Sequence, residues 1–163
     1  ETHLASMGFL VRFSQRFIGN SKDMDATDGR NSVFGVGRVT DANHVIACYP
    51  GQGAGYTRHR DAFIKNHGKP ARAVTILCYL KPDWENSQGG CLRTFYNDQF
   101  GVERTWDIEP KLGRLVIFRS CDVEHEVLPA YFERFAVTVW LYSMPTSIPV
   151  EIETGSIVTT TKK

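Results

Sequence analysis

Residues 73–80 have the sequence Ala-Val-Thr-Ile-Leu-Cys-Tyr-Leu, which is apolar at almost every position and rich in β-branched side chains. A similar run, Arg-Phe-Ala-Val-Thr-Val-Trp-Leu-Tyr-Ser, occupies residues 134–143. Runs of this length and composition, bounded by turn residues, are typical of β-strands. They predict that the fold is built mainly from strands.

Shorter extended segments surround these two runs, and turn residues separate them. Residues 50–55, Pro-Gly-Gln-Gly-Ala-Gly, form one such turn, and residues 81–90 form a longer one. Several short strands with turns between them indicate a sandwich or a barrel. The predicted strands are residues 44–49, 73–80, 91–96, 106–110, 114–119, 125–128 and 134–143.

The N-terminal part has a different pattern. In residues 2–18, Leu4, Met7 and Val11 recur at helical spacing, which predicts an amphipathic helix that packs without chemistry. Residues 19–42 are polar and predict a solvated loop. The expected fold is therefore a mainly β double-stranded β-helix, or jelly roll, with a supporting N-terminal helix.

The chain has 163 residues, for which one domain is the ordinary expectation. We expect this domain to span residues 1–144, followed by a C-terminal tail at residues 145–163 that is rich in Thr, Ser and Val. The first residue is Glu1 and no initiator Met is present, which suggests an N-terminally trimmed chain.

Composition argues against several classes of function. The net charge is +1 and no basic stripe alternates with aromatic residues, so nucleic-acid binding has no electrostatic support. No run of 18 apolar residues is present, so no membrane span is expected. The four cysteines form no C-x-x-C pair, which argues against zinc or dithiol chemistry and favours a reducing compartment, the cytoplasm or nucleus.

Residues 55–61, Gly-Tyr-Thr-Arg-His-Arg-Asp, contain two candidate metal ligands. On an extended segment, His59 and Asp61 would point to the same side and Arg60 to the other. His125 could supply a third ligand from a different strand. Two histidines and one carboxylate on one face of a metal form the facial triad of non-haem Fe(II) oxygenases. A bare H-x-D is weak by itself, but the ordered set is more specific.

Arg134 follows His125 by nine residues and completes this candidate site. Its guanidinium could hold a dicarboxylate co-substrate beside the metal, because the planar fork matches a carboxylate. The alternative is a structural ion pair with a carboxylate of the protein itself.

Several longer segments resemble one known family. Residues 47–53, Ala-Cys-Tyr-Pro-Gly-Gln-Gly, together with residues 55–61, are similar to the prolyl hydroxylase domain enzymes that act on hypoxia-inducible factor. The resemblance covers roughly residues 1–142. It extends through residues 78–84 (Cys-Tyr-Leu-Lys-Pro-Asp-Trp), 89–93 (Gly-Gly-Cys-Leu-Arg), 107–111 (Asp-Ile-Glu-Pro-Lys), 125–131 (His-Glu-Val-Leu-Pro-Ala-Tyr) and 134–140 (Arg-Phe-Ala-Val-Thr-Val-Trp).

The resemblance implies a dioxygenase that depends on Fe(II) and 2-oxoglutarate, hydroxylates a prolyl residue at C4 with O2, releases succinate and CO2, and uses ascorbate as reductant. It makes residues 1–144 the catalytic domain. It assigns iron to His59, Asp61 and His125, and the distal carboxylate of 2-oxoglutarate to Arg134 and Tyr79. The pocket around that co-substrate would be lined by Tyr49, Leu92, Val127, Thr138 and Trp140, with Arg72 and Tyr56 at the substrate entrance. For Tyr79 and Trp140, ordinary core packing is the alternative.

The substrate stays open at this point. A proline-containing protein is expected, either a hypoxia-inducible transcription factor or the F-box adaptor of SCF ubiquitin ligases, with oxygen sensing as the role. Alternatives are a dioxygenase for another target (a ribosomal protein, an elongation factor or a free amino acid) and a non-catalytic jelly-roll module. Mn, Co, Ni or Zn could also fit the ligand set. The oligomeric state is unknown, with a monomer favoured.

Overall fold

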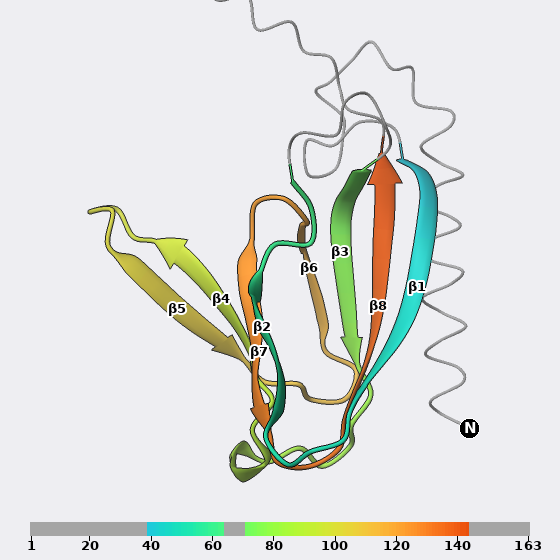
Figure 1. Cartoon of the computed structure of the whole chain (residues 1–163), viewed down its shortest axis with the longest axis vertical. Helices are drawn as coiled ribbons and strands as arrows, with labels where there is room; N and C mark the ends of the chain where they lie inside the picture. The colour runs from blue at the N-terminus through green and yellow to red at the C-terminus, as the bar shows by residue number, and fades with distance from the viewer. Residues whose placement is uncertain (1–38, 64–70, 144–163) are drawn as a thin grey trace, which may run out of the picture.

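The computed structural model describes residues 39–63 and 71–143 (Figure 1). These residues form eight strands and one short 3₁₀ helix. The predicted helix at residues 2–18 and the predicted tail at residues 145–163 lie outside the described residues, as does the boundary between domain and tail. The mainly β class predicted from the sequence is confirmed.

The strands follow one another with short connections, and their bounds are as follows. They are β1 (Val39–Tyr49), β2 (Ala54–His59), β3 (Ala71–Tyr79), β4 (Leu92–Asn97), β5 (Glu103–Ile108), β6 (Leu115–Arg119), β7 (Glu124–Ala130) and β8 (Arg134–Ser143), with the 3₁₀ helix η2 (Asn86–Gln88) between β3 and β4.

The eight strands form two antiparallel sheets of four. One sheet has the order β1-β8-β3-β6 and is called here the large sheet; the other has the order β2-β7-β4-β5 and is called the small sheet. Apart from the consecutive strands β4 and β5, the chain alternates between the two sheets, so that the other neighbouring strands in a sheet are distant in sequence (Figure 1). This is the predicted jelly roll, with the β4–β5 hairpin extending away from the large sheet.

The central strands of the large sheet are buried on both faces. Val74 and Ile76 of β3 join one hydrophobic cluster, whereas Leu77 and Tyr79 join another. A strand that is covered on both sides needs no polar alternation, which explains the continuous apolar run at residues 73–80. The second cluster forms the core between the sheets and consists of Leu77, Tyr79, Leu92, Phe118, Val127 and Ala136.

Several predicted strands are longer or shifted in the structure, and β1 and β5 differ most. β1 begins at Val39 rather than at residue 44, because its pairing with β8 continues to Val39 opposite Ser143. β5 spans Glu103–Ile108 rather than residues 106–110, because it pairs with the whole of β4. Residues 103–107 are exposed, so no hydrophobic pattern marks the start of this strand.

Within residues 39–63 and 71–143, no helix is long and apolar enough to cross a membrane. All four cysteines fall in this part of the chain and are free thiols, with Cys78 and Cys91 buried and Cys48 exposed.

We predict that Gly89→Ala destabilises the fold by about 3 kcal/mol or more. Gly89 has φ 64° and ψ −152°, a conformation nearly restricted to glycine, and an added Cβ would collide with the carbonyl oxygen of Pro129. Gly101→Ala is the matched control, because Gly101 has φ +76° and nothing within 4 Å of the added Cβ. It should cost only about 1 kcal/mol. Equal losses in urea unfolding would contradict the collision.

Candidate metal centre

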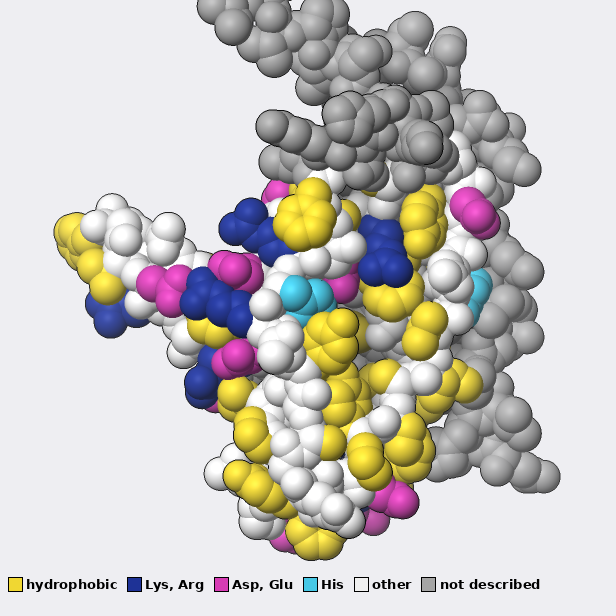
Figure 2. All heavy atoms as spheres, viewed as in Figure 1, with side chains coloured by type: hydrophobic (Ala, Val, Ile, Leu, Met, Phe, Trp, Pro, Cys, Tyr) yellow, Lys and Arg dark blue, Asp and Glu magenta, His cyan; other side chains and the backbone are white. Residues whose placement is uncertain are grey.

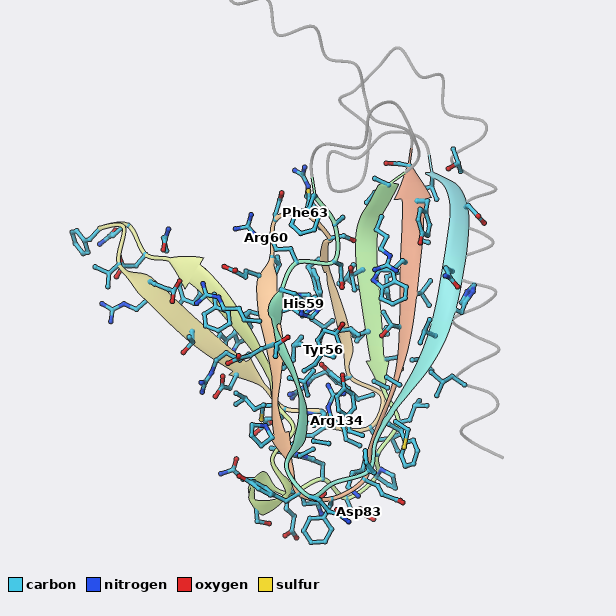
Figure 3. All side chains as sticks on the ribbon, in the orientation of Figure 1. Tyr56, His59, Arg60, Phe63, Asp83 and Arg134 are labelled. Carbon is cyan, nitrogen blue, oxygen red and sulfur yellow. The ribbon has the colours of Figure 1, made fainter. Side chains whose placement is uncertain are left out.

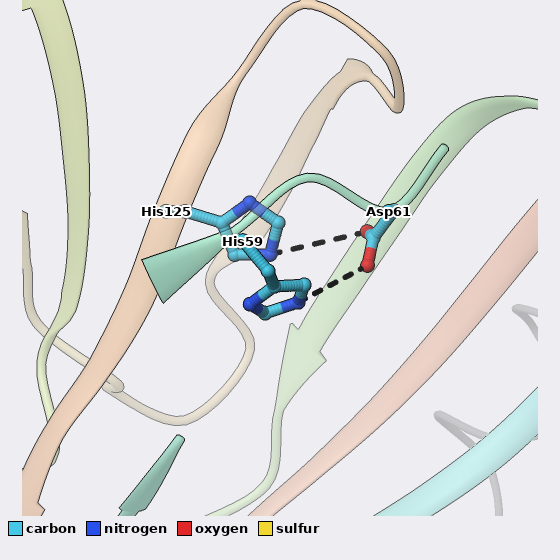
Figure 4. A group of neighbouring side chains, drawn as sticks. All are labelled: His59, Asp61 and His125. Atoms are coloured by element: carbon cyan, nitrogen blue, oxygen red, sulfur yellow. Dashed lines mark ion pairs between the residues drawn. The ribbon is translucent and has the colours of Figure 1, made fainter. Parts of the chain in front are cut away.

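The three predicted metal ligands come together beside the small sheet. His59 ends β2 and pairs directly with His125 of β7, and Asp61 follows two residues after His59. Nε2 of His59 lies 3.4 Å from Oδ1 of Asp61, and Nε2 of His125 lies 3.9 Å from Oδ2. One ligand atom from each residue lies within 4.8 Å of the others (Figure 4). The three groups are therefore close enough to share one divalent cation.

The backbone at this point differs from the extended segment that the sequence predicted. β2 ends at His59 and the chain bends at Asp61. The amide of Ala62 donates a hydrogen bond of 3.1 Å to the carbonyl of Ser120, which draws the chain away from β7 toward the end of β6. Arg60 is exposed and points away from the cluster, as predicted (Figure 3).

Backbone carbonyls orient both imidazole rings. Nδ1 of His59 lies 2.7 Å from the carbonyl oxygen of Thr57, and Nδ1 of His125 lies 3.1 Å from that of Val123. A carbonyl can only accept, so each Nδ1 carries the proton and donates it. Each Nε2 then faces Asp61, so the ring nitrogen that can bind a metal is turned toward the carboxylate.

Burial of the His125 side chain also favours metal binding. The side chain is 6% exposed, and desolvation lowers its pKa below the ordinary value, with smaller opposing effects from Val123 and Asp61. The imidazole is therefore neutral at neutral pH, the form that a metal requires.

Asp61 is a buried carboxylate whose oxygens form no salt bridge with Lys or Arg among the described residues, although Nη1 of Arg72 donates a 3.4 Å hydrogen bond to its backbone carbonyl. Its side chain is 7% exposed, and its only ion-pair partners among the described residues are the two imidazoles. An ionised carboxylate in such surroundings is costly unless it is paired or coordinates a metal. A bound cation would therefore stabilise the cluster.

Arg134, the first residue of β8, is a buried basic side chain, whereas Asp61 is a buried acidic one. It is 4% exposed, and its Nε donates a 2.8 Å hydrogen bond to the carbonyl of Gly90. The guanidinium carbon lies 4.8 Å from the ring centre of Tyr49 and 5.1 Å from that of Tyr79. Within residues 39–63 and 71–143 no carboxylate pairs with it, so the structural ion pair considered from the sequence is absent there. Arg134 can therefore receive an external anion.

Tyr79 is the second donor at this end of the interior. It is fully buried, and its hydroxyl has no hydrogen-bond partner within the part of the chain that the structure describes. Burial raises its pKa to about 12, although the charge of Arg134 acts in the opposite direction. The phenol stays protonated at neutral pH and can donate to an anion held by Arg134.

The other predicted pocket residues line the interior between the metal ligands and the Arg134 end. Leu92 and Val127 belong to the same core cluster as Tyr79, and Tyr49 packs against it. On β8, Thr138 and Trp140 share the inward side with Arg134, because side chains alternate along a strand. Trp140 pairs with Thr75, so this row runs from Arg134 toward the metal ligands.

The two predicted entrance residues lie beside the metal ligands. The guanidinium carbon of Arg72 stacks 3.9 Å from the centre of the Trp140 ring, and its Nε donates to the hydroxyl of Tyr142 at 3.3 Å. Tyr56 is 55% exposed, with its ring 4.6 Å from that of His59 (Figure 3). On this face a histidine reaches the surface beside basic side chains, above a band of hydrophobic ones (Figure 2).

Sequence reasoning missed three neighbours of the cluster. Thr75 and Ser120 are buried hydroxyls next to Asp61, and the Phe118 ring packs edge-on against His125 at 5.0 Å. One signal was present, because Thr75 is the only residue with an aliphatic hydroxyl in the run 73–80.

These observations fit an iron centre with a dicarboxylate co-substrate. Two imidazoles and one carboxylate are the ligand set of non-haem Fe(II) sites that leave further positions open. Arg134 and the unpartnered hydroxyl of Tyr79 supply the donors that a carboxylate needs.

Comparisons with known proteins agree with this geometry. The family model described as "2OG-Fe(II) oxygenase superfamily" matches residues 44–142. Human Egl nine homolog 1 is 45% identical over 141 residues, which are 85% of this chain and 28% of that protein. The resemblance to the prolyl hydroxylase domain enzymes is confirmed.

Two solved structures are also similar. A prolyl-4-hydroxylase from Pseudomonas putida is 43% identical with a TM-score of 0.54, covering 63% of this chain and 53% of its own. A prolyl hydroxylase from Trichoplax adhaerens, solved with a peptide of the oxygen degradation domain of hypoxia inducible factor, is 38% identical with a TM-score of 0.53, covering 64% and 45%. The chain spans about a third of the length of the curated relatives that it matches.

We predict that Asp61→Ala lowers the affinity for Mn(II) by more than about 100-fold. Loss of a residue that only supports a ligand costs about 10–100-fold, and loss of the ligand itself should cost more. Free Mn(II) can be measured by electron paramagnetic resonance during a titration. Asp41→Ala is the control, because Asp41 is exposed on β1. Binding that is unchanged in Asp61→Ala would exclude this centre.

Proposed function

The chain belongs to the 2OG-Fe(II) oxygenase superfamily, and from this premise we propose that it is an Fe(II)- and 2-oxoglutarate-dependent prolyl 4-hydroxylase that acts on a protein. One observation carries the proposal. A cluster of two imidazoles and one carboxylate lies at one end of the row of inward side chains on β8, and a buried arginine without a carboxylate partner among the described residues lies at the other. A metal-chelating dicarboxylate would complete both ends.

Each residue then has a defined task. His59, Asp61 and His125 hold the iron, and Arg134 and Tyr79 hold the distal carboxylate of 2-oxoglutarate. Leu92, Val127 and Thr138 line the co-substrate and keep water from it, together with Tyr49 and Trp140.

When bound, the iron and co-substrate supply the oxidation, in which O2 gives one oxygen atom to the substrate carbon and one to succinate, with release of CO2. The protein contributes alignment of the substrate and a dry site around the reaction. Ascorbate would act as the reductant that keeps the iron in the Fe(II) state. Because both imidazoles are oriented by carbonyls, the ligands need little rearrangement to receive the metal.

The proposed substrate is a prolyl residue in an extended segment of a protein. The Trichoplax relative, at 38% identity, was solved with a hypoxia inducible factor peptide, and this supports a segment of such a transcription factor. Arg72 and Tyr56 would contact that segment, because both lie beside the metal ligands and Tyr56 is half exposed. Oxygen sensing in the cytoplasm or nucleus would be the role. The F-box adaptor of SCF ligases stays a second arm of the test.

We predict that Tyr79→Phe weakens 2-oxoglutarate binding roughly 10-fold to 100-fold, because a hydrogen bond to a charged group contributes about 1.5–3 kcal/mol. The dissociation constant can be measured by calorimetry with Mn(II) in the site. Tyr96→Phe is the matched control, since Tyr96 is 53% exposed on β4. Wild-type affinity in Tyr79→Phe would remove Tyr79 from the co-substrate site.

The function itself can be tested by mass spectrometry. The protein is incubated with Fe(II), 2-oxoglutarate, ascorbate and air, together with a transcription-factor degradation peptide or the intact F-box adaptor. We expect one added oxygen on a proline of the peptide, and none with the Asp61→Ala variant.

The other outcomes separate the alternatives. Oxygen on the adaptor alone would move the substrate to the ubiquitin ligase. Succinate without oxygen on either protein would keep the dioxygenase and exclude both substrates. Partner binding without succinate, unchanged in Asp61→Ala, would indicate a non-catalytic module.

A further inference from the structure

Two buried hydroxyl groups form a chain that ends at the Asp61 carboxylate. Oγ1 of Thr75 lies 2.7 Å from Oδ2 of Asp61, and Oγ of Ser120 lies 2.8 Å from Oγ1 of Thr75. Thr75 and Ser120 are 1% and 0% exposed. Thr75 lies on β3 and Ser120 directly after β6, so the chain connects both strands to the segment after β2.

The direction of these hydrogen bonds follows from the number of protons. An ionised carboxylate only accepts, so the single hydroxyl proton of Thr75 is donated to Asp61. Thr75 must then accept from Ser120, whose only hydroxyl proton points to Thr75. Both dipoles are therefore aimed at the carboxylate, and each bond polarises the next.

The hydroxyl of Thr75 distinguishes the two oxygens of Asp61. Each oxygen faces one imidazole, Oδ1 that of His59 at 3.4 Å and Oδ2 that of His125 at 3.9 Å, but only Oδ2 also accepts the hydrogen bond from Thr75. A carboxylate whose second oxygen is already bonded tends to give one oxygen to a metal rather than two. One-oxygen ligation would keep a further coordination position available for co-substrate or O2.

We propose that Thr75 and Ser120 are positioning residues for the metal centre, holding Asp61 so that it gives only Oδ1 to the metal. The inference rests on the metal centre of the proposed function and not on the identity of the substrate.

The competing explanation is that the side chains of Thr75 and Ser120 only stabilise the fold. Backbone hydrogen bonds already connect the segments involved. The amide of Ser120 donates to the carbonyl of Ala73 at 3.0 Å, and its carbonyl accepts from the amide of Ala62 at 3.1 Å. These two bonds connect β3 and the segment after β2 without either side chain. The hydroxyls of Thr75 and Ser120 are therefore not needed for this connection, and their hydrogen bonds lead to the Asp61 carboxylate.

The test is a titration of the metal-free protein with Co(II), followed by its visible absorption, for wild type, Thr75→Val, Thr75→Ser and Ser120→Ala. Thr75→Val keeps the shape of the side chain and removes the hydroxyl. We expect it to weaken Co(II) binding about 10–100-fold and to change the absorption bands, because the carboxylate can then ligate differently. Ser120→Ala should lose less, and Thr75→Ser should stay near wild type.

The controls separate this inference from folding and from the proposed function. Metal-free melting temperatures of the variants report packing, and Ser120→Ala serves if Thr75→Val fails to fold. Wild-type Co(II) affinity and spectrum in both Thr75→Val and Ser120→Ala would overturn the inference, as would equal losses in Thr75→Val and Thr75→Ser. If the wild-type protein itself bound no Co(II), the metal centre and the proposed function would fail with it.

Discussion

The antiparallel register between β3 and β8 decides which side chains enter the interior of the jelly roll. Thr75 lies opposite Trp140, Leu77 opposite Thr138, and Tyr79 opposite Ala136. Because side chains alternate along a strand, a slip of one residue in β8 would turn its whole inward set outward. The hydrophobic cluster that contains Val137, Val139 and Leu141 on the other side of β8 opposes such a slip. Hydrophobic packing on the other side of β8 therefore fixes the positions of the inward side chains that form the site.

In the small sheet, irregular pairing between β2 and β7 also positions the side chains of the site. The register between β2 and β7 shifts twice, on either side of Tyr56, before His59 comes to lie opposite His125. Shifts of this kind re-aim side chains and occur frequently beside active sites. Ending the strand at His59 then lets the chain bend, so that Asp61 approaches from the direction of β6 rather than from β2. The three ligands thus surround a point instead of lying along one strand.

Features that depend on local sequence were predictable. The runs at residues 73–80 and 134–143 specify their strands because burial on both faces favours apolar side chains at most positions. His59, Asp61, His125 and Arg134 were identified as a candidate set from residue type and order, and the structure brings the three candidate ligands together. The start of β5 was not predictable, because exposed residues carry no hydrophobic pattern. The chain from Ser120 through Thr75 to Asp61 was missed for another reason: it joins three segments that only the folded topology makes neighbours.

Among the described residues, Asp61 and Arg134 are buried groups of opposite charge, and the fold keeps them apart. Asp61 lies at the level of Thr75 and Trp140, whereas Arg134 begins β8 near Gly90. Between them stand Leu77, Leu92 and Val127, which belong to the hydrophobic core. Two opposite charges in one interior would gain most by pairing directly, and the rigid register prevents it. Each is instead positioned for a separate partner, Asp61 by the Thr75 hydroxyl and two imidazoles, and Arg134 by a carbonyl and two aromatic rings. A metal bound to a ligand with a free carboxylate at its far end would neutralise both sites together. The separation of the two charges therefore makes the interior selective for such a pair.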